Sequence, residues 1–595
     1  MSLLSLDDWR DIDVRLALLV SVLATPALTF LITSASARYR LLRYEARGEN
    51  DAVEPPTAPF AVPGLAHTVS FAFKTASYIG ELGKRFGSIP LRLRVAGMDM
   101  YYVPPGATLH GIFKNSRQLS KHMIGIMLKR QFGMREEDIG IWAADESGIF
   151  AQPAPGHEGA DPAKRLWHIV HRDLQTHLSG TPVNIMTAKF AEMFARRITG
   201  SNPNVRSGEW TELPDLYAFL RVEMLYAAVE ALCGTALFDI APTFVEDFWA
   251  YDDAFPTIFR RIPKFIAPGA YAARERMHEH MKAWHLWAGA NFDWESPEAL
   301  EADWEPVYGS KIMRARAQMV RNAGMTIEGV AALDAGFVWT ANANAIPAAI
   351  WAVFDIIRVE GLRERVLAET EPCFTPHTLD FDLPRLCSLP LLTSVYMEEL
   401  RLRAAATVTR QVVTDDFSVG PWWFRRGANI FALPWFGGRD AGFWNTGREG
   451  DERPVARFWA ERFLEYPEDP ASGPVRDRER PEVSGAAAGA TDGGEKVRPG
   501  PGRREKTSED DARARVVTTG IQGHYYPYGG GVKICPGRFF AKQEIMVSVA
   551  VLLRACEIEL VDPEGAEGIG EDMGRFPLGT LPPDGKIPFR IRRRL

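Results

Sequence analysis

A single cysteine near the C-terminus has neighbours suited to a metal-binding thiolate. The segment reads Tyr526-Pro-Tyr-Gly-Gly-Gly-Val-Lys-Ile-Cys535-Pro-Gly-Arg, and helix-like sequence follows it. A helix N-terminus favours an anion and lowers the pKa of a nearby thiol, and Gly537 offers an N–H group there without steric bulk. The glycines before the cysteine, of which Gly531 is the last, let the backbone lie close to a flat ligand. The segment therefore predicts a thiolate that holds the metal of a planar ligand.

Two side chains beside these glycines suit the same ligand. Lys533 is placed to meet a carboxylate on the ligand's edge, and Tyr528 offers a ring that can pack beneath its plane. A buried structural cysteine beside a glycine-rich turn is the alternative interpretation.

The order aromatic, glycine, cation, cysteine, glycine resembles the haem-ligand loop of the cytochrome P450 superfamily. It is formed by Tyr528, Gly531, Lys533, Cys535 and Gly537, with tyrosine and lysine where that loop usually has phenylalanine and arginine. The resemblance implies haem b (iron protoporphyrin IX) with Cys535 as its axial ligand, whose sulfur pushes electron density that favours O–O cleavage. It also implies a mainly α fold with a small β region.

A Glu-x-x-Arg motif lies upstream, where the resemblance requires it. Glu398 and Arg401 are three residues apart on a helical stretch, so they share a face and can pair. Such pairs are common on solvated helix faces, but in the family this pair is buried and completed by an arginine from a later loop. That arginine corresponds to Arg462, in a segment with Ala460 in place of the usual proline. The resemblance gives the three residues a structural role in holding the haem-loop scaffold.

The residues 330–357 predict a helix that is apolar nearly all round. Such a helix lies in a large core or in a membrane, and polar residues such as Asn342 and Asn344 in its middle favour the core. Pro347 is expected to kink the helix, because it cannot bond to the carbonyl of Ala343. The freed carbonyl and the asparagines would form a small polar notch in an apolar wall.

This notch is similar to the oxygen side of one P450 branch, which holds cholesterol 7α-hydroxylase, sterol 12α-hydroxylase and prostacyclin synthase. The likeness is carried by Trp339-Thr-Ala-Asn-Ala-Asn344-Ala-Ile-Pro347. Most of the superfamily has an acid–threonine pair where this chain has Ala343 and Asn344. An amide nitrogen only donates and its oxygen only accepts, so proton delivery is expected through water held by Asn344 or Asn342. An asparagine that only hydrogen-bonds the kinked turn is the alternative.

Further positions follow from the resemblance. Arg410 looks like the family's strand arginine at a haem propionate, and its neighbours Thr407 and Val408 are expected to face substrate. Leu578 and Gly579 resemble the last hairpin turn, which caps the pocket.

A segment beginning at Arg165 occupies the region where the family often has Trp-x-x-x-Arg. After Trp167, one of His168, His171 or Arg172 is expected at a propionate, unless the segment is an exposed amphipathic helix.

Composition agrees with a large catalytic body. The chain has 595 residues, 46% hydrophobic and 24% charged, enough to bury a sizeable core. Its formal net charge is −7, and no basic block alternates with aromatics, which argues against nucleic-acid binding. The 5 cysteines are scattered without a CxxC or Cys/His cluster, as expected in a reducing compartment.

The N-terminal region predicts a membrane anchor. Residues 16–37 carry no charge and are long enough to span a bilayer. Acidic residues precede them and arginines follow, so the positive-inside bias places residues 1–15 in the lumen and the body in the cytosol. A cleaved signal peptide ending near Ala37 is the alternative. The anchor predicts a single-pass protein of the endoplasmic reticulum membrane.

The remaining boundaries follow from composition. Residues 38–64 form a basic stop and a proline-rich hinge, and residues 65–595 form the haem-thiolate catalytic domain. Within it, residues 467–515 are rich in Gly, Ala and mixed charge, which predicts a disordered loop insertion.

The resemblance implies a monooxygenase that inserts one atom of O2 into a bulky lipophilic substrate such as a sterol, terpenoid or polyketide. Its electrons would come from NADPH through NADPH-cytochrome P450 reductase. Two alternatives stay open. One is an isomerase or dehydratase of an oxygenated lipid that uses neither O2 nor NADPH, since the branch contains such an enzyme with the same asparagine. The other is a non-enzymatic haem-binding sensor.

Overall fold

The computed structural model describes residues 14–48, 51–200, 202–415, 417–448, 451–476 and 506–594, without the side chains of residues 14–21 and 23. Most of the predicted lumenal segment and residues 477–505 of the predicted insertion lie outside the described residues. The chain divides into two compact units. Unit 1 comprises Met1–Met127, Ala406–Gly437 and Gly529–Ile534, and unit 2 comprises Leu128–Ala405, Gly438–Tyr528 and Cys535–Leu595.

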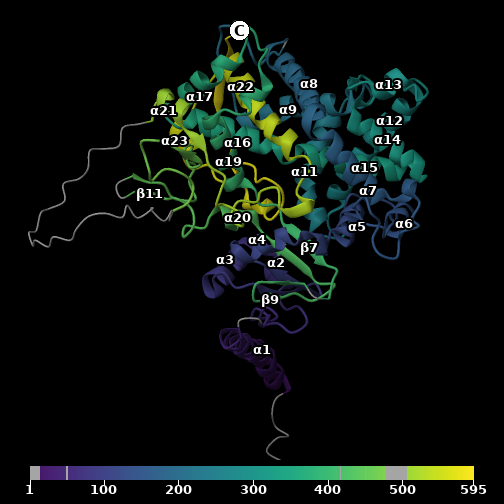
Figure 1. Ribbon diagram of the computed structural model, residues 1–595, viewed down its shortest axis with the longest axis vertical. Coiled ribbons are helices and arrows are strands. Elements are labelled where there is room, and N and C mark those ends of the chain that lie inside the picture. Colours follow the sequence, from purple (N-terminus) through teal and green to yellow (C-terminus); the bar gives the residue numbers. More distant parts are fainter. Residues whose placement is uncertain are drawn as a thin grey trace, which may run out of the picture. The chain divides into compact units, whose positions relative to one another are not determined.

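Unit 1 is built on a five-stranded sheet of order β1-β2-β10-β7-β3, of which Figure 1 labels strand β7. The strands are β1 (Leu91–Val95), β2 (Met98–Tyr102), β3 (Leu119–Ser120), β7 (Val408–Val412) and β10 (Asn429–Ala432). Strand β10 pairs parallel with β2 and antiparallel with β7, where Ile430 lies opposite Arg410. The unit also contains the helices α2 (Thr68–Phe73), α3 (Thr75–Phe86) and α4 (Ala107–Lys114) and the hairpin of β8 (Ser418–Val419) and β9 (Trp422–Trp423).

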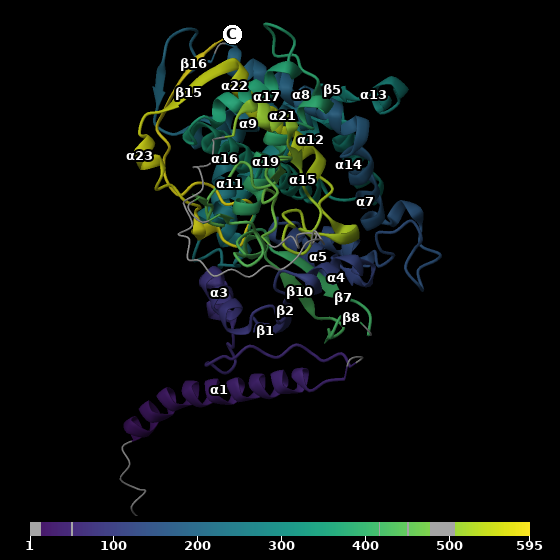
Figure 2. The ribbon, with the colours of Figure 1, turned by 60° about the vertical axis from the view of Figure 1, so that its left-hand side comes forward.

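Helix α1 (Val14–Glu45) includes the predicted anchor and continues through the basic residues after it. Figure 2 shows the hinge running beside this helix. The Thr33 hydroxyl donates to the Phe60 carbonyl at 3.0 Å, and Tyr44 stacks on Trp422 with ring centroids 4.5 Å apart. Ala37 is buried. The last part of the predicted anchor therefore packs on protein.

Unit 2 is mainly helical. Its longer helices are α6 (Glu136–Ala144), α7 (Leu166–His177), α8 (Gly180–Thr199), α9 (Leu216–Cys233), α11 (Phe244–Phe259), α12 (Pro268–Asn291), α14 (Lys311–Ala323), α15 (Ile327–Asn342), α16 (Ala345–Arg358), α17 (Leu362–Thr370), α19 (Pro390–Arg403) and α22 (Arg538–Ala555). A three-stranded antiparallel sheet joins β4 (Thr211–Leu213), β15 (Cys556–Leu560) and β16 (Phe589–Arg593). Helix α5 (His122–Gln131) runs from unit 1 into unit 2. The mainly α fold with a small β region agrees with the prediction.

The core of unit 2 surrounds α16. Every residue of this helix from Ala345 to Ile356 is buried, and it packs against α9, α19 and α22 (Figure 1). Ile327–Arg358 is also the one stretch, within the part of the chain that the structure describes, long and apolar enough to cross a membrane. Because 72% of its most apolar window is buried inside the protein, it is a core helix, as predicted.

The predicted insertion is ordered at both ends, which corrects its boundaries. Residues 467–476 are described, and residues 508–513 form helix α21 (Ser508–Arg513). Thr507 caps this helix through a capping box, and the buried Asp511 receives Nε and a terminal nitrogen of Arg365 at 2.8 and 2.7 Å. These contacts hold a segment whose composition alone predicts disorder.

Candidate functional site

Unit 2 brings together the three residues of the predicted structural cluster. Arg401 donates through Nε and a terminal nitrogen to the two carboxylate oxygens of Glu398, at 2.7 and 2.8 Å. Arg462 donates through Nε to the same carboxylate at 3.0 and 3.2 Å. All three side chains are completely buried. The expected pairing of helix α19 with a later loop arginine is therefore present.

Two arginines share one carboxylate in this cluster, and burial lowers the pKa of Arg462 to about 10. Burial alone raises the pKa of Glu398, but Arg401 and Arg462 outweigh it and hold that pKa below its usual range. The Val455 carbonyl accepts a further hydrogen bond from Arg401 at 2.8 Å, and the Asn445 carbonyl accepts one from Arg462. The cluster thereby ties α19 to residues 445–462, the stretch that leads toward the cysteine loop.

The cysteine loop closes on itself in unit 2. The Cys535 N–H donates to the Tyr528 carbonyl at 3.0 Å. Helix α22 begins at Arg538 with Gly537 as its N-cap, so Pro536 precedes the first turn rather than lying in it. A Cβ added to Gly537 would lie 3.8 Å from the Cys535 sulfur. The half-buried Cys535 thus precedes an 18-residue helix by a short, tight turn.

Tyr528 has a partner that the family's usual phenylalanine could not have. Its hydroxyl accepts a hydrogen bond from Tyr396 of α19 at 3.0 Å. Burial, then the neighbouring Tyr396, raises the pKa of Tyr528, so the phenol stays protonated. The hydrogen bond fixes the ring beside the cysteine loop.

The loop residues that belong to unit 1 carry a buried cation beside a second one. Lys533 donates to the Leu119 carbonyl, and Arg410 donates to the carbonyls of Gly530 and Lys533 at 3.0 and 3.3 Å. Burial lowers the pKa of Arg410 to about 10, and burial together with Arg410 lowers the pKa of Lys533 to about 8. Among the described residues no carboxylate pairs with either cation, and Arg410 Nε has no partner. Two buried positive charges of this kind suit an anionic ligand.

Two glycines of the loop are required by protein contacts. A Cβ added to Gly530 would lie 2.4 Å from the Phe113 ring, and one added to Gly531 would lie 2.1 Å from the Ser116 hydroxyl. Gly531 also has a φ of +70°, which favours glycine. Contacts with Phe113 and Ser116 therefore require these glycines in addition to the predicted approach to a flat ligand, which stays a prediction.

A third cation, Lys129 of α5, is half-buried and was not predicted. Its ammonium lies 3.8 Å from the ring centroid of Trp142 and 4.4 Å from that of Trp167. Burial, then Arg316, lowers the pKa of Lys129 to about 7. Trp167 was singled out in the sequence, but the lysine beside it lies far upstream, and no spacing links the two.

The other candidates near Trp167 have different roles. The Ile149 carbonyl lies 3.0 Å from His168 Nδ1, and Arg172 is 57% exposed and pairs with Asp173. His171 is half-buried. Of the cations near Trp167, Lys129 is therefore the one that packs against its ring.

The long apolar helix breaks at the expected carbonyl. Helix α15 ends at Asn342, Ala343 and Asn344 form a turn, and α16 begins at Ala345. Pro347 lies in the first turn of α16, where its missing N–H leaves no bond unmade. The interruption is thus four residues before the proline.

The two asparagines at this break face different partners. Asn342 is buried and donates its amide to the Val338 carbonyl at 2.8 Å, within its own helix. Asn344 Oδ1 accepts the Thr580 backbone N–H at 2.9 Å. A Cβ added to Gly579, which has a φ of +57°, would lie 2.7 Å from the same oxygen. The structure therefore joins Asn344 to the predicted hairpin turn at Leu578 and Gly579.

Near this break, a polar group within an aromatic cluster was missed by sequence reasoning. Asp252 of α11 accepts Trp339 Nε1 at 2.8 Å and an Arg575 nitrogen at 2.7 Å. Phe255 packs on Trp339 with ring centroids 3.9 Å apart, and Phe132 lies within 6.0 Å of both. Burial raises the pKa of Asp252, although Arg575 and Trp339 oppose the shift. No sequence spacing connects these residues.

Unit 1 holds the remaining pocket candidates. Thr407 and Val408 are half-buried at the start of β7, and a Cβ added to Gly529 would lie 3.4 Å from Val408.

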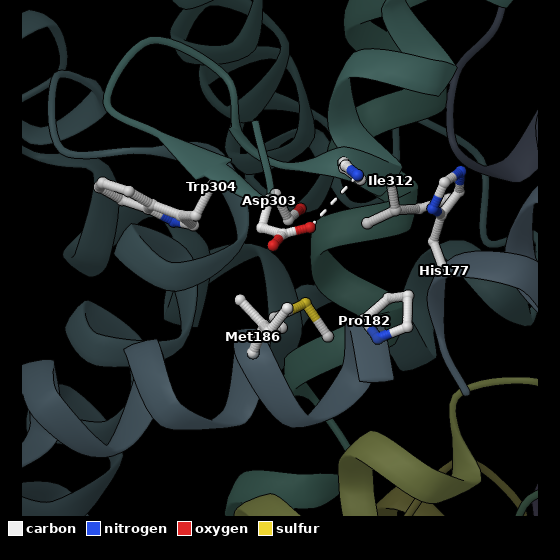
Figure 3. A pocket seen from close by; sticks show the side chains of 9 residues that line it. His177, Pro182, Met186, Asp303, Trp304 and Ile312 are labelled. Atoms are coloured by element: carbon white, nitrogen blue, oxygen red, sulfur yellow. Dashed lines mark ion pairs between the residues drawn. The ribbon is translucent and has the colours of Figure 1, made fainter. Parts of the chain in front are cut away.

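A separate small cavity lies elsewhere in unit 2, between α7, α8 and the start of α14 (Figure 3). Its volume of about 10 Å³ suits one water molecule. Asp303 and Lys311 pair across its edge at 3.2 Å. It contains none of the predicted site residues.

Each unit, considered by itself, carries residues whose chemistry suits a haem. Unit 2 supplies a cysteine beside a helix N-terminus and a broken helix with polar groups, and unit 1 supplies two buried cations without carboxylate partners. These residues match an iron-binding thiolate and cations for two propionates.

Comparisons with known proteins give the family. No protein-family model matches the chain. It is 32% identical over 593 residues to the cytochrome P450 monooxygenase fsoE of Humicola fuscoatra, covering 97% of this chain and 95% of that protein. It is 31% identical to the cytochrome P450 monooxygenase efuG of Hormonema carpetanum, covering 91% and 90%.

More distant relatives agree with the predicted branch. The chain is 23% identical over 461 residues to cytochrome P450 7A1 of Oryctolagus cuniculus, covering 73% of this chain and 77% of that protein. It is 28% identical to human 7-alpha-hydroxycholest-4-en-3-one 12-alpha-hydroxylase over 43% of each chain. The chain belongs to the cytochrome P450 family and is a haem-thiolate monooxygenase.

Proposed function

We propose that this monooxygenase inserts one atom of O2 into a C–H bond of a bulky lipophilic substrate, with electrons from NADPH delivered by NADPH-cytochrome P450 reductase. The observation that carries the proposal is the cysteine loop. Cys535 lies two residues before Gly537, the N-cap of α22, and the same unit contains the buried cluster of Glu398, Arg401 and Arg462.

Cys535 is the proposed axial ligand of the haem. Bound there, the haem supplies the chemistry that activates oxygen. Arg410 and Lys533 are the proposed partners of its propionates, since both are buried without a carboxylate partner among the described residues. Lys129 is a third candidate. Tyr528 holds its ring beside the loop through Tyr396, and Gly531 and Gly537 keep the loop backbone compact.

The substrate is proposed to be a sterol, terpenoid or polyketide. Two distant relatives are named for sterol hydroxylation, one of them for 12-alpha-hydroxylation of 7-alpha-hydroxycholest-4-en-3-one. The cluster of Phe132, Phe255 and Trp339 supports a large apolar substrate, because aromatic side chains offer extensive apolar contact. Thr407, Val408, Leu578 and Gly579 are proposed to line the pocket.

Asn344 is proposed to act on the oxygen side with Asn342 and Ala343. Because its Oδ1 is taken by Thr580, its amide nitrogen is the group left to hold a water or a ligand oxygen. The same fixed donor also favours the second candidate function. A donor alone suffices to orient an oxygenated lipid for isomerisation or dehydration, which needs no relay of protons from water.

We also propose that α1 anchors the enzyme in the endoplasmic reticulum membrane with its body in the cytosol. The supporting observations are the 32-residue length of α1 and the uncharged stretch within it.

Isotope labelling tests the reaction. Membranes containing the full chain and the reductase are incubated with NADPH and a lipophilic extract of the host under ¹⁸O-labelled dioxygen, and products are analysed by mass spectrometry. Membranes with Cys535→Ala serve as the control. A product that gains one labelled oxygen, absent from the control, supports monooxygenation and identifies the substrate class. A product of unchanged mass without label contradicts it in favour of isomerisation.

A further inference from the structure

The helix break carries no hydroxyl that is available for proton transfer. Thr340, one turn earlier, donates its hydroxyl to the Gly336 carbonyl at 2.7 Å. Asn342 donates its amide to the Val338 carbonyl. Both side chains are thus bonded back to their own helix. The polar group nearest the break is the Asn344 amide.

The Asn344 amide is held in one orientation. Its Oδ1 accepts the Thr580 N–H at 2.9 Å, so the amide nitrogen must point away from the hairpin. The nitrogen of an amide donates hydrogen bonds but does not accept a proton. Asn344 can therefore position a water or a ligand, but it cannot both receive a proton and pass one on.

Thr580 is fixed beside this amide by the backbone. It lies opposite Ala404 in an antiparallel bridge, with hydrogen bonds on both sides from Ala405 N–H to the Gly579 carbonyl at 2.8 Å and from Leu581 N–H to the Arg403 carbonyl at 3.0 Å. The residues on either side of Thr580 are thus bonded to the chain at the C-terminal end of α19, and the Thr580 N–H itself donates to Asn344.

The Thr580 hydroxyl makes no hydrogen bond to another described residue. The residue is only 5% exposed, yet within the described chain no group hydrogen-bonds to its Oγ1. In any staggered rotamer a threonine Oγ1 lies within about 4 Å of its own amide nitrogen. Because that nitrogen lies 2.9 Å from Asn344 Oδ1, the hydroxyl is no more than about 7 Å from this oxygen, on the residue that the helix break contacts.

We propose that the Thr580 hydroxyl is the proton-relay group of this enzyme, with Asn344 as the positioning residue that holds it. In the relay, the Thr580 O–H proton passes to the reacting oxygen as a new O–H bond forms there. A water proton then replaces it on the threonine oxygen, so the side chain is unchanged and solvent is the net proton donor. The inference rests on the proposed monooxygenase function.

The test compares Thr580→Val with Thr580→Ser in the full-length, haem-loaded enzyme. Valine has the shape of threonine but no hydroxyl, and it keeps the backbone N–H that Asn344 accepts. Serine restores the hydroxyl. Thr370→Val is the matched control, because Thr370 is also buried but donates to the Val366 carbonyl in α17.

Two readouts are measured. The first is the C–O stretching frequency of the carbon monoxide complex in H2O and in D2O, which reports hydrogen bonding to a ligand without turnover. The second is the peroxide released per NADPH oxidised with reductase present. Thr580→Val is expected to lose the solvent-isotope shift and to release several-fold more peroxide, whereas Thr580→Ser and Thr370→Val resemble the native enzyme.

Native values for Thr580→Val in both readouts would overturn the relay. Equal defects in Thr580→Val and Thr580→Ser would also overturn it, because they would assign Thr580 a packing role. Failure of the proposed function itself appears differently, as a native chain whose product gains no labelled oxygen under ¹⁸O-labelled dioxygen.

Discussion

At the scale of single residues, the most telling contrast is between buried or half-buried cations with and without a carboxylate. Arg401 and Arg462 share Glu398, so their charges are paired at 0% exposure. Arg410, Lys533 and Lys129 have burial-lowered pKa values and no carboxylate partner among the described residues. Burying an unpaired charge is costly, so these three cations are expected to be relieved by an anionic ligand.

The pH dependence of the free energy of unfolding tests this view for Lys129. In the haem-free chain its pKa is about 7, below the value of 10.5 expected when unfolded. Between these values the unfolded chain binds the extra proton, so the free energy of unfolding should rise with pH, by at most about 1.4 kcal/mol per pH unit. Lys129→Met should remove that part of the slope, as measured by urea unfolding from pH 7 to 10.

Lys264→Met provides the control, because Lys264 is exposed. Its slope should equal that of the native chain. If Lys129→Met also kept the native slope, the pKa of Lys129 would not be lowered in the folded protein.

At the scale of elements, α19, α22 and the broken pair α15 and α16 position the site. The cluster of Glu398, Arg401 and Arg462 joins α19 to the segment before the cysteine loop. The hydrogen bond between Asn344 and Thr580 joins the helix break to the C-terminal hairpin. These links connect elements that are remote in sequence.

Arg462→Met should expose the cost of breaking the cluster. Removing one arginine leaves Glu398 buried with one partner fewer, so unfolding free energy should fall by about 3–5 kcal/mol and haem content should fall with it. Thermal or urea unfolding and the haem-to-protein ratio measure both effects.

Arg130→Ala is the comparison for this variant. Arg130 pairs with Glu136 at 54% and 73% exposure, and an ion pair this exposed contributes little to stability. Equal losses in the two variants would contradict a stabilising role for the buried cluster.

The sequence anticipated these elements only where a local pattern encodes them. The spacing of Glu398 and Arg401 predicted their shared face, and Pro347 predicted a break at the carbonyl of Ala343. Thr580 could not be predicted as the partner of Asn344, because 236 residues separate them and the bond uses a backbone N–H. Lys129 was missed because cation–aromatic packing leaves no fixed spacing.

At the scale of the whole molecule, the chain combines a mainly helical unit, a sheet-containing unit and a long N-terminal helix. The family resemblance predicted the fold class, whereas composition misplaced the ends of the insertion. The helix α21 and the bond of Asp511 to Arg365 depend on tertiary contacts that composition does not record. The packing of Thr33 on Phe60 likewise shows protein contacts within the predicted anchor, which hydropathy alone places in lipid.

Removal of residues 1–37 tests the anchor at this scale. The truncated chain should leave the membrane pellet and appear in the high-salt supernatant, because the uncharged stretch is the proposed membrane segment. Its carbon monoxide spectrum should be retained, since the cysteine loop lies elsewhere. Fractionation of the truncated chain entirely with membranes would contradict α1 as the sole anchor.

The most direct test of the account is the carbon monoxide difference spectrum of the reduced, full-length protein with and without Cys535. The native chain and the control Cys387→Ala, which removes a half-buried thiol at the end of α18 (Leu383–Leu386), should both show the red-shifted Soret band typical of a thiolate ligand. Cys535→Ala should lose that band and all product formation. Retention of the band in Cys535→Ala, or its loss in Cys387→Ala alone, would contradict Cys535 as the ligand of the haem iron.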